Sequence, residues 1–472
     1  MESLEQKLAN YSKLGMYSFH TPGHKGRSDI LAPLVFPDYD LTELPGLDML
    51  HNPQGVIAKA QEKAAKAYGA EETFFLVNGA TAGNQAMFLA LMESLKNKKI
   101  RIERKAHRSV IGALILSGLT PEYVPAIIHP DFNLPLGLDS EEYVDNYDQV
   151  GAFHLTNPSY YGTAVDLDSI IKRRDTEIPT VPILVDQAHG SHFRDNLFPR
   201  GAVEQGADLV LHSTHKTLAA LTQAGMLHIQ GERVDRSSLR RSLELLQTSS
   251  PSYLLMASLE NAISNLENRH SWEDLYGEVL SLQEKLDGPL RLLTAKDVGK
   301  YGIKEVDWSK ILVNVSSLGI GAAEAVHVLR SSFLIEPELW DDNNILFMLG
   351  IGSRPEEVRI LCRALESLVK SYLPKTDTGL TSRNKEKTKP LLPPVRITPR
   401  EAWLAPKRIV KLKDSLGKIA GETISIYPPG IPLVASGEEI TSGVLDYLFR
   451  AEEYNWQGWQ GFGRGEILIV DK

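Results

Sequence analysis

The chain is poor in cysteine, in excess positive charge and in long apolar runs, and each shortage excludes a class of protein. Its 472 residues contain a single cysteine, Cys362, so an internal disulfide framework and a cysteine-based zinc site are both excluded. The net charge of −9 gives no basic footprint, and we expect no nucleic-acid partner. No apolar run approaches the roughly 20 residues that a membrane-spanning helix needs, and the charged N-terminus does not resemble a signal peptide. We therefore expect a protein of the reducing cytoplasm, without a membrane partner.

What the sequence does contain is a long region in which strands and helices alternate. Six short apolar runs between about residues 70 and 230 are expected strands, namely 73–77, 99–103, 152–156, 181–185, 208–212 and 225–229. Amphipathic helical segments lie between several of them. This alternation predicts an α/β fold, with a mostly parallel sheet and helices on both of its faces. In such sheets ligands bind at the carboxyl ends of the strands.

The remaining segments suggest further domains. We expect an N-terminal segment over 1–50, a large domain over 51–255 and a small α/β domain over 256–373. Residues 374–390 are polar and lack apolar periodicity, which is typical of a linker, and 391–472 should form a C-terminal domain. No cluster of histidine and acidic residues has the spacing of metal ligands, so no metal site is expected.

A lysine follows one of the expected strands, in the run Leu211-His-Ser-Thr-His-Lys-Thr217. Lys216 is suited to form an imine with an aldehyde cofactor, because burial at a strand end favours the neutral amine. Ser213 could bind a phosphate oxygen, and His215 could move protons near the imine. Taken alone, the run could equally be a polar loop without chemistry.

Another expected strand ends at an aspartate, in Ile183-Leu-Val-Asp-Gln-Ala-His-Gly190. The Asp186 carboxylate could pair with a protonated pyridine nitrogen, which would make the ring an electron sink. It precedes Lys216 by one strand and one helix, so both side chains should reach the same sheet edge. His189 could contact the cofactor's phenolic oxygen or simply line the pocket.

Two further strand ends carry polar turns. In Phe74–Asn84 a strand meets a helix through small residues, and Gly79, Ala80 and Thr81 are candidates for a phosphate cup. An ordinary helix start would look the same. His107, after the strand 99–103, could stack on a cofactor ring, a role that depends on the other motifs.

In this order the motifs resemble those of the fold type I pyridoxal-phosphate enzymes, and more narrowly the short form of the bacterial Orn/Lys/Arg decarboxylase family. The resemblance spans almost the whole chain. The matching stretches are Ser18–Lys25, Leu44–Gly55, Phe74–Asn84, Ala106–Ser109, Asp186–Gly190, Ser213–Lys216, Gln247–Tyr253, Tyr427–Leu433 and Ser436–Glu438.

The resemblance implies a role for each candidate in holding pyridoxal 5′-phosphate. Lys216 should carry the cofactor covalently, Asp186 should pair with the ring nitrogen and His107 should stack on the ring. Phosphate binding should fall to Thr81 and Ser213 with neighbouring backbone N–H groups, and proton donation to His215. The family's active sites lie at a dimer interface, so a homodimer or higher homo-oligomer with shared active sites is expected, in which Thr248 and Ser249 could reach the neighbouring subunit's cofactor.

The sequence departs from relatives of the family in two ways, at three positions. Ala80 and Ala82 stand where relatives often have hydroxyl residues, so phosphate binding should depend more on the backbone. His189 stands where some relatives have tryptophan, which leaves its role open.

The implied reaction is decarboxylation of a basic amino acid. Arginine, giving agmatine for polyamine metabolism, is favoured by the short form, with lysine and ornithine left open. A distal cation needs an acceptor carboxylate, for which Glu438, Glu439 and Asp48 are candidates. The alternatives are another fold type I activity, such as an aminotransferase, and a non-catalytic family member.

Overall fold

The computed structural model describes residues 10–31, 38–145, 149–266, 269–372, 392–426, 431–450, 456–461 and 463–471. The expected linker at 374–390 lies outside these ranges, as do 427–430 of the late motif. Within the described ranges, none of the helices combines the length and apolar character that a membrane crossing requires.

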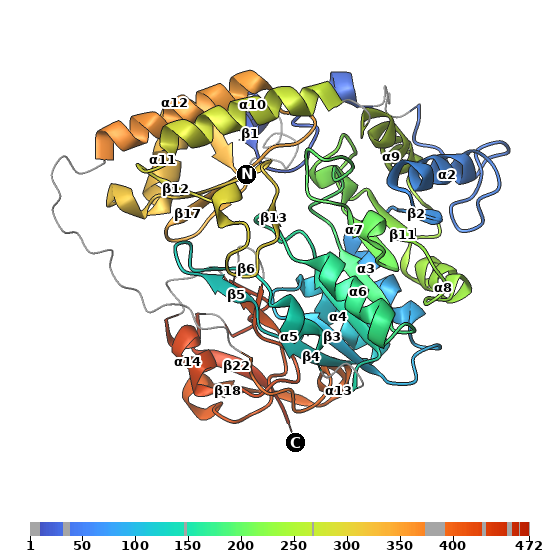
Figure 1. The fold of residues 1–472 in the computed structure, drawn as a ribbon. Coiled ribbons are helices and arrows are strands. Elements are labelled where there is room, and N and C mark those ends of the chain that lie inside the picture. Colours follow the sequence, from blue (N-terminus) through green and yellow to red (C-terminus); the bar gives the residue numbers. More distant parts are fainter. Residues whose placement is uncertain are drawn as a thin grey trace.

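A seven-stranded sheet forms the centre of the molecule (Figure 1). Five of its strands run parallel in the order β10-β9-β7-β3-β4, and β11 lies antiparallel between β10 and β2. The mostly parallel sheet predicted from the sequence is therefore confirmed. The strands are β2 (Glu72–Leu76), β3 (Lys99–Glu103), β4 (Thr120–Val124), β7 (Ala152–Thr156), β9 (Ile183–Asp186), β10 (Leu209–His212) and β11 (Gly225–Ile229).

Helices cover both faces of this sheet, because most of its strands are apolar on both sides. One face packs on α3 (Gly79–Ala90), α4 (Arg108–Ser117) and α8 (Arg236–Leu246). The other packs on α5 (Ser140–Val144), α6 (Leu167–Glu177) and α7 (Ala202–Gln205). At the β2 edge, α2 (Val56–Tyr68) and α9 (Tyr253–Leu266) share an apolar cluster.

A second sheet lies beside the first and is antiparallel. Its strands are β12 (Arg291–Leu292), β14 (Lys310–Asn314), β17 (Asn344–Met348) and β16 (Leu339–Trp340). The long helices α10 (Arg269–Leu286) and α12 (Pro355–Tyr372) run together across the top of Figure 1, with α11 (Ala322–Phe333) below them. The N-terminal strand β1 (Tyr17–Phe19) pairs with β15 (Ile335–Pro337), so the beginning of the chain is bound to this unit.

The C-terminal residues form a small unit at the bottom of Figure 1. It contains the pairs β18 (Lys407–Lys411) with β22 (Glu466–Val470) and β19 (Ile424–Ile426) with β20 (Ile431–Val434) and β21 (Trp456–Gln457). Two short helices, α13 (Pro399–Leu404) and α14 (Ser442–Phe449), complete it. A buried ion pair, Arg104 Nη2 to Glu438 Oε2 at 2.9 Å, joins this unit to the end of β3.

A series of hydrogen bonds runs through two neutral histidines, His212 and His228, within the large sheet. Gln187 Nε2 donates to His212 Nε2 at 2.9 Å, His212 Nδ1 donates to His228 Nε2 at 3.0 Å, and His228 Nδ1 donates to Thr73 Oγ1 at 2.8 Å. Each ring thus uses one donor and one acceptor nitrogen. Burial lowers the pKa of His228 to about 3 and holds that of His212 well below its ordinary value. Protonation of either ring would break this series of hydrogen bonds.

These histidines should make the fold sensitive to acid. Between the unfolded pKa near 6.5 and the lower folded pKa, the unfolded chain binds more protons, so stability falls as pH falls, by up to about 1.4 kcal/mol per pH unit for each histidine. We expect the urea midpoint to drop from about pH 7 to about pH 5, and to drop less steeply in His228→Gln. His327→Gln, at an exposed position on α11, is the matched control. If the urea midpoint fell equally steeply with pH in the wild type, in His228→Gln and in His327→Gln, this account would be contradicted.

Candidate active site

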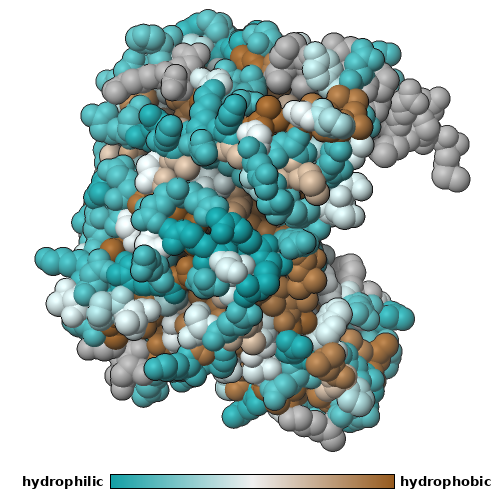
Figure 2. All heavy atoms as spheres, turned by 90° about the vertical axis from the view of Figure 1, so that its right-hand side faces the viewer, coloured by the Kyte–Doolittle hydropathy of each residue, from teal (hydrophilic) through white to brown (hydrophobic). Residues whose placement is uncertain are grey.

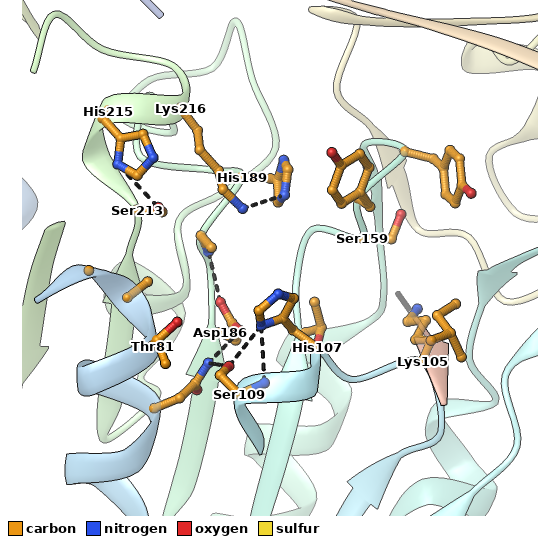
Figure 3. A pocket seen from close by; sticks show the side chains of 18 of the residues that line it. Thr81, Lys105, His107, Ser109, Ser159, Asp186, His189, Ser213, His215 and Lys216 are labelled. Atoms are coloured by element: carbon orange, nitrogen blue, oxygen red, sulfur yellow. Dashed lines mark hydrogen bonds between the residues drawn. The ribbon is translucent and has the colours of Figure 1, made fainter. Parts of the chain in front are cut away.

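A cavity of about 260 Å³ opens at the carboxyl ends of the central strands (Figure 3). The structure brings most of the candidates from the sequence together in its wall. These are Gly79, Ala80, Thr81, His107, Asp186, His189, Ser213, His215 and Lys216. They come from loops after four different strands, and only the parallel arrangement of the sheet gathers them at one edge.

Lys216 lies in a short 3-10 turn directly after β10, and its Nζ is 2.8 Å from His189 Nε2. Burial lowers the pKa of Lys216, while the charges of Asp186 and Glu338 oppose that shift. Burial, followed by the charge of Lys216, holds the pKa of His189 well below its ordinary value. His189 is therefore a neutral acceptor for Lys216, and the lysine is biased toward the amine that attacks carbonyl carbon.

The Asp186 carboxylate ends the buried strand β9. Oδ1 accepts a hydrogen bond from Ala188 N at 3.1 Å, and Oδ2 accepts one from Asn84 Nδ2 at 2.8 Å. Both donors are neutral, and in the described part of the chain no lysine or arginine lies within salt-bridge distance of it. A buried carboxylate without a cationic partner is costly. It suits a ligand that brings a proton-bearing ring nitrogen.

His107 precedes the first turn of α4 and caps that helix. Its Nδ1 accepts a hydrogen bond from Ser109 N at 3.2 Å and lies 2.9 Å from Ser109 Oγ. Burial lowers the pKa of His107, while the charge of Asp186 opposes that shift. In Figure 3 the imidazole lies beside Asp186 and Ser109, where a flat neutral ring could cover one face of a cofactor.

The other end of the cavity is formed by the start of α3 and by Ser213. Gly79 has a φ of +73°, which lets the chain turn sharply from β2 into the helix. His215 Nδ1 donates to Ala224 O at 3.0 Å, and burial lowers the pKa of this histidine. Free N–H groups at a helix start attract anions. With a carboxylate at the ring-nitrogen position and a lysine between, this set of donors fits pyridoxal 5′-phosphate.

A loop from the beginning of the chain supports the Lys216 turn. Gly23 N donates to His215 O at 2.7 Å, and Gly352 N donates to Gly23 O at 3.0 Å. A Cβ on Gly23 would lie 2.5 Å from the carbonyl carbon of Thr217, so only glycine allows this approach. Three segments far apart in the sequence thus meet behind the reactive lysine.

Thr248 and Ser249 are exposed after α8 and do not line this cavity. Thr248 O accepts a hydrogen bond from His51 Nε2 at 2.9 Å, which joins this loop to the N-terminal segment. Their expected contact with a neighbouring subunit's cofactor stays a prediction.

The three acids proposed for the substrate's distal cation are already engaged elsewhere. Glu438 is bound to Arg104 and Glu439 Oε2 accepts from Arg396 Nε at 2.7 Å. Asp48 accepts hydrogen bonds from backbone N–H groups at the start of α2, which outweigh its partial burial and lower its pKa to about 2. None of the three lines the cavity. The structure therefore does not place them in the pocket of a single chain, and their contact with the substrate's distal cation stays a prediction.

Several residues in the wall of the cavity were not anticipated. Ser159, Tyr160 and Tyr161 come from the loop after β7, and the polar run that follows this strand could have indicated them. Asn84 and Lys105 also line the cavity. Nothing in the local sequence distinguishes Asn84 from any polar residue on a helix.

Comparison with known proteins gives two family matches. Residues 3–307 match the family described as Orn/Lys/Arg decarboxylase, major domain, and residues 383–464 match its C-terminal domain. Among curated proteins, the arginine decarboxylase of Halalkalibacterium halodurans is 32% identical over 460 residues, covering 93% of this chain and 91% of its own. The arginine decarboxylase of Bacillus subtilis is 32% identical over 452 residues, covering 92% and 90%.

Solved structures share the fold at lower identity. The lysine decarboxylase of Francisella novicida superposes with a TM-score of 0.77 at 19% identity, over 100% of this chain and 81% of that one. The serine palmitoyltransferase of Sphingomonas wittichii gives 0.55 at 18% identity, over 76% and 88%. The predicted fold class is confirmed.

The cavity holds two lysines, which allows a test of which one takes the cofactor. After incubation with pyridoxal phosphate and reduction with borohydride, mass spectrometry of peptides should find the adduct on Lys216. Lys216→Ala should lose the adduct, because Lys216 supplies the amine that hydrogen-bonds to His189 in the cavity wall, while Lys105→Ala, the matched control, should keep it. An adduct on Lys105, or one that persists in Lys216→Ala, would contradict the assignment.

Proposed function

This chain belongs to the Orn/Lys/Arg decarboxylase family, and from that premise we propose that it uses pyridoxal phosphate to remove the α-carboxylate of arginine, giving agmatine for polyamine metabolism. The observation that carries the proposal is the placement of Lys216 and Asp186 in the wall of one cavity. A lysine with a lowered pKa and a carboxylate without a cation are the two groups between which the cofactor would lie.

The residues of the cavity divide the chemistry among them. When bound, pyridoxal phosphate supplies an electron sink for the bond pair released as carbon dioxide leaves. Asp186 holds the ring-nitrogen proton, and His107 fixes the plane of the ring from one face. The N–H groups at the start of α3, with Thr81 and Ser213, hold the phosphate.

Proton movement falls to the groups on the opposite side. His189, held neutral by burial, accepts a hydrogen bond from Lys216 Nζ and keeps the amine oriented. We assign the return of a proton to the substrate's Cα to Lys216 Nζ or to His215, which would first take up a proton from water at Nε2, since the hydrogen on its Nδ1 is donated to Ala224 O. Both side chains line the cavity on the same loop.

The choice of arginine has two supports. The curated relatives that are 32% identical over most of the chain are named arginine decarboxylases, whereas the lysine decarboxylase of Pseudomonas aeruginosa is 24% identical. Tyr160 and Tyr161 also line the cavity, and Lys216 Nζ lies 5.9 Å from the centre of the Tyr160 ring. Aromatic faces suit a planar guanidinium better than a compact ammonium.

We propose further that the working unit is a homodimer. Asp186 is the one carboxylate among the described residues that line the cavity, so a second chain is a reasonable source of the acceptor for the distal cation. A wider groove of about 1130 Å³ adjoins the cavity and shares Thr81, His107 and Ser109 with it. Hydrophobic residues gather along a hollow in the side of the molecule (Figure 2). Leu44, Met49 and Val56 are exposed and lie within seven residues of His51, which hydrogen-bonds to Thr248.

The reaction is tested by supplying arginine, lysine and ornithine separately to the enzyme with pyridoxal phosphate, and measuring carbon dioxide and amine. We expect agmatine to form, with kcat/KM for arginine at least about tenfold above that for lysine. Lys216→Ala is the inactive control. A 2-oxo acid product would indicate an aminotransferase, and cofactor binding without any product would indicate a non-catalytic member.

Shared sites are tested by hybrid dimers. Lys216→Ala and the double variant Thr248→Glu/Ser249→Glu should each be inactive, the second because two carboxylates would face the partner's cofactor phosphate. Coexpressed, they should recover about a quarter of wild-type activity, since half of the chains pair as hybrids with one intact site each. Activity no higher than that of the separate variants would contradict shared sites.

A further inference from the structure

A buried amide connects the two side chains that face the cofactor ring. Asn84, on α3, is 1% exposed. Its Nδ2 donates to Asp186 Oδ2 at 2.8 Å and to Ser109 Oγ at 2.9 Å, and its Oδ1 lies 3.2 Å from His154 Nε2. Every hydrogen-bonding site of the amide except one acceptor lone pair is therefore used.

The direction of each bond is fixed by its partners. Asp186 can only accept, so Nδ2 must face it, and a flipped amide would set oxygen against oxygen. Burial lowers the pKa of His154 to about 4, against the charge of Asp186, so this ring is neutral and carries one hydrogen. That hydrogen lies on Nε2, where it donates to Asn84 Oδ1.

The same logic continues to His107. Ser109 Oγ accepts from Asn84, so the hydroxyl hydrogen is free to point at His107 Nδ1, 2.9 Å away. Ser109 N donates to that same nitrogen at 3.2 Å. His107 Nδ1 is thus an acceptor twice over, and the neutral ring carries its hydrogen on Nε2.

We propose that Asn84 is a positioning residue that couples Asp186 to His107, through Ser109, and so sets the orientation of one and the tautomer of the other before the cofactor arrives. The inference rests on the proposed use of pyridoxal phosphate. Asn84 acts through its neighbours and takes no part in the reaction itself. Without the amide, Asp186 keeps one donor, Ala188 N, and the Ser109 hydroxyl can turn away from His107.

Loss of the amide should have a signature in pH as well as in affinity. An imidazole that has lost a donor at Nδ1 takes up a proton there more readily. A positive charge on His107 would weaken the hold on a protonated pyridine, and so would a less firmly held Asp186. The other charged or titratable groups that act on this pair are His154, His189, Lys216 and Arg108, and the variants below leave them in place.

The test compares cofactor affinity among variants of the full chain. Apoprotein would be titrated with pyridoxal phosphate by visible absorbance from about pH 8 to about pH 6, and each variant's Kd divided by the wild-type Kd at the same pH. Asn84→Ala should weaken binding about 10- to 100-fold, the range typical when a residue that orients a metal ligand by a hydrogen bond is removed. The ratio should grow as the pH falls.

Three further proteins make the result specific. Ser109→Ala is a smaller change, so it tests the proposal even if Asn84→Ala does not fold. It should weaken binding less than Asn84→Ala does, and its ratio should also grow as the pH falls. The double variant should lose less than the product of the two ratios, because the Ser109 hydroxyl acts through Asn84. Asn314→Ala removes a comparably buried and hydrogen-bonded amide from the small domain and should leave the ratio at one.

The possible failures are distinguishable. Binding by Asn84→Ala and Ser109→Ala within about twofold of wild type at every pH would overturn the positioning role. A ratio of Kd values that is raised equally at every pH would also overturn it, because a general loosening of the site would weaken binding without any dependence on a titrating group. If the wild-type chain itself binds no pyridoxal phosphate, the proposed function has failed, and this inference with it.

Discussion

A buried carboxylate without a cation is the constraint on which the rest of the site depends. Two neutral donors, Asn84 Nδ2 and Ala188 N, hold Asp186 at the end of a strand that is apolar on both faces. Burying a charge in this way is expensive unless a counter-charge arrives. The sheet, the helix that presents Asn84 and the loop that presents Lys216 together hold that charge in the wall of the cavity. Under the proposed function, this arrangement would select for a protonated ring before any substrate is considered.

The surroundings of the cavity bias the nearby bases toward their neutral forms. Burial lowers the pKa values of His107, His189 and His215, and that of Lys216. A neutral imidazole can accept a proton and a neutral amine can attack carbonyl carbon, whereas their protonated forms have no lone pair with which to do so. Decarboxylation needs a site that binds a phosphate group at one end and lets a carboxylate leave as neutral carbon dioxide at its centre. A cluster of buried, mostly neutral bases satisfies both requirements.

Local sequence was enough to predict the sheet and half of the site. Ile183-Leu-Val-Asp and Leu209-Val-Leu-His are short apolar runs buried on both faces, and the polar residues that follow them lie at one edge by the geometry of parallel strands. The edge strand β4 was missed because Thr120-Pro-Glu-Tyr-Val is only half buried and contains proline. Asn84 and the true partner of Glu438 were missed for a different reason. Their partners are 102 and 334 residues away in the sequence, and the local sequence around a residue does not indicate a partner so far along the chain.

The loop behind Lys216 determines when the protein can become an enzyme during synthesis. Gly23, the Lys216 turn and Gly352 hydrogen-bond to one another, and β1 pairs with β15 more than three hundred residues later in the chain. A ribosome that has delivered the lysine has therefore not yet delivered the segment that shapes its loop. The nascent chain must wait for residue 352, and for Glu438 to close on Arg104, before the cavity has its final walls. Such late closure keeps a reactive amine from being presented in a finished pocket on an unfinished protein.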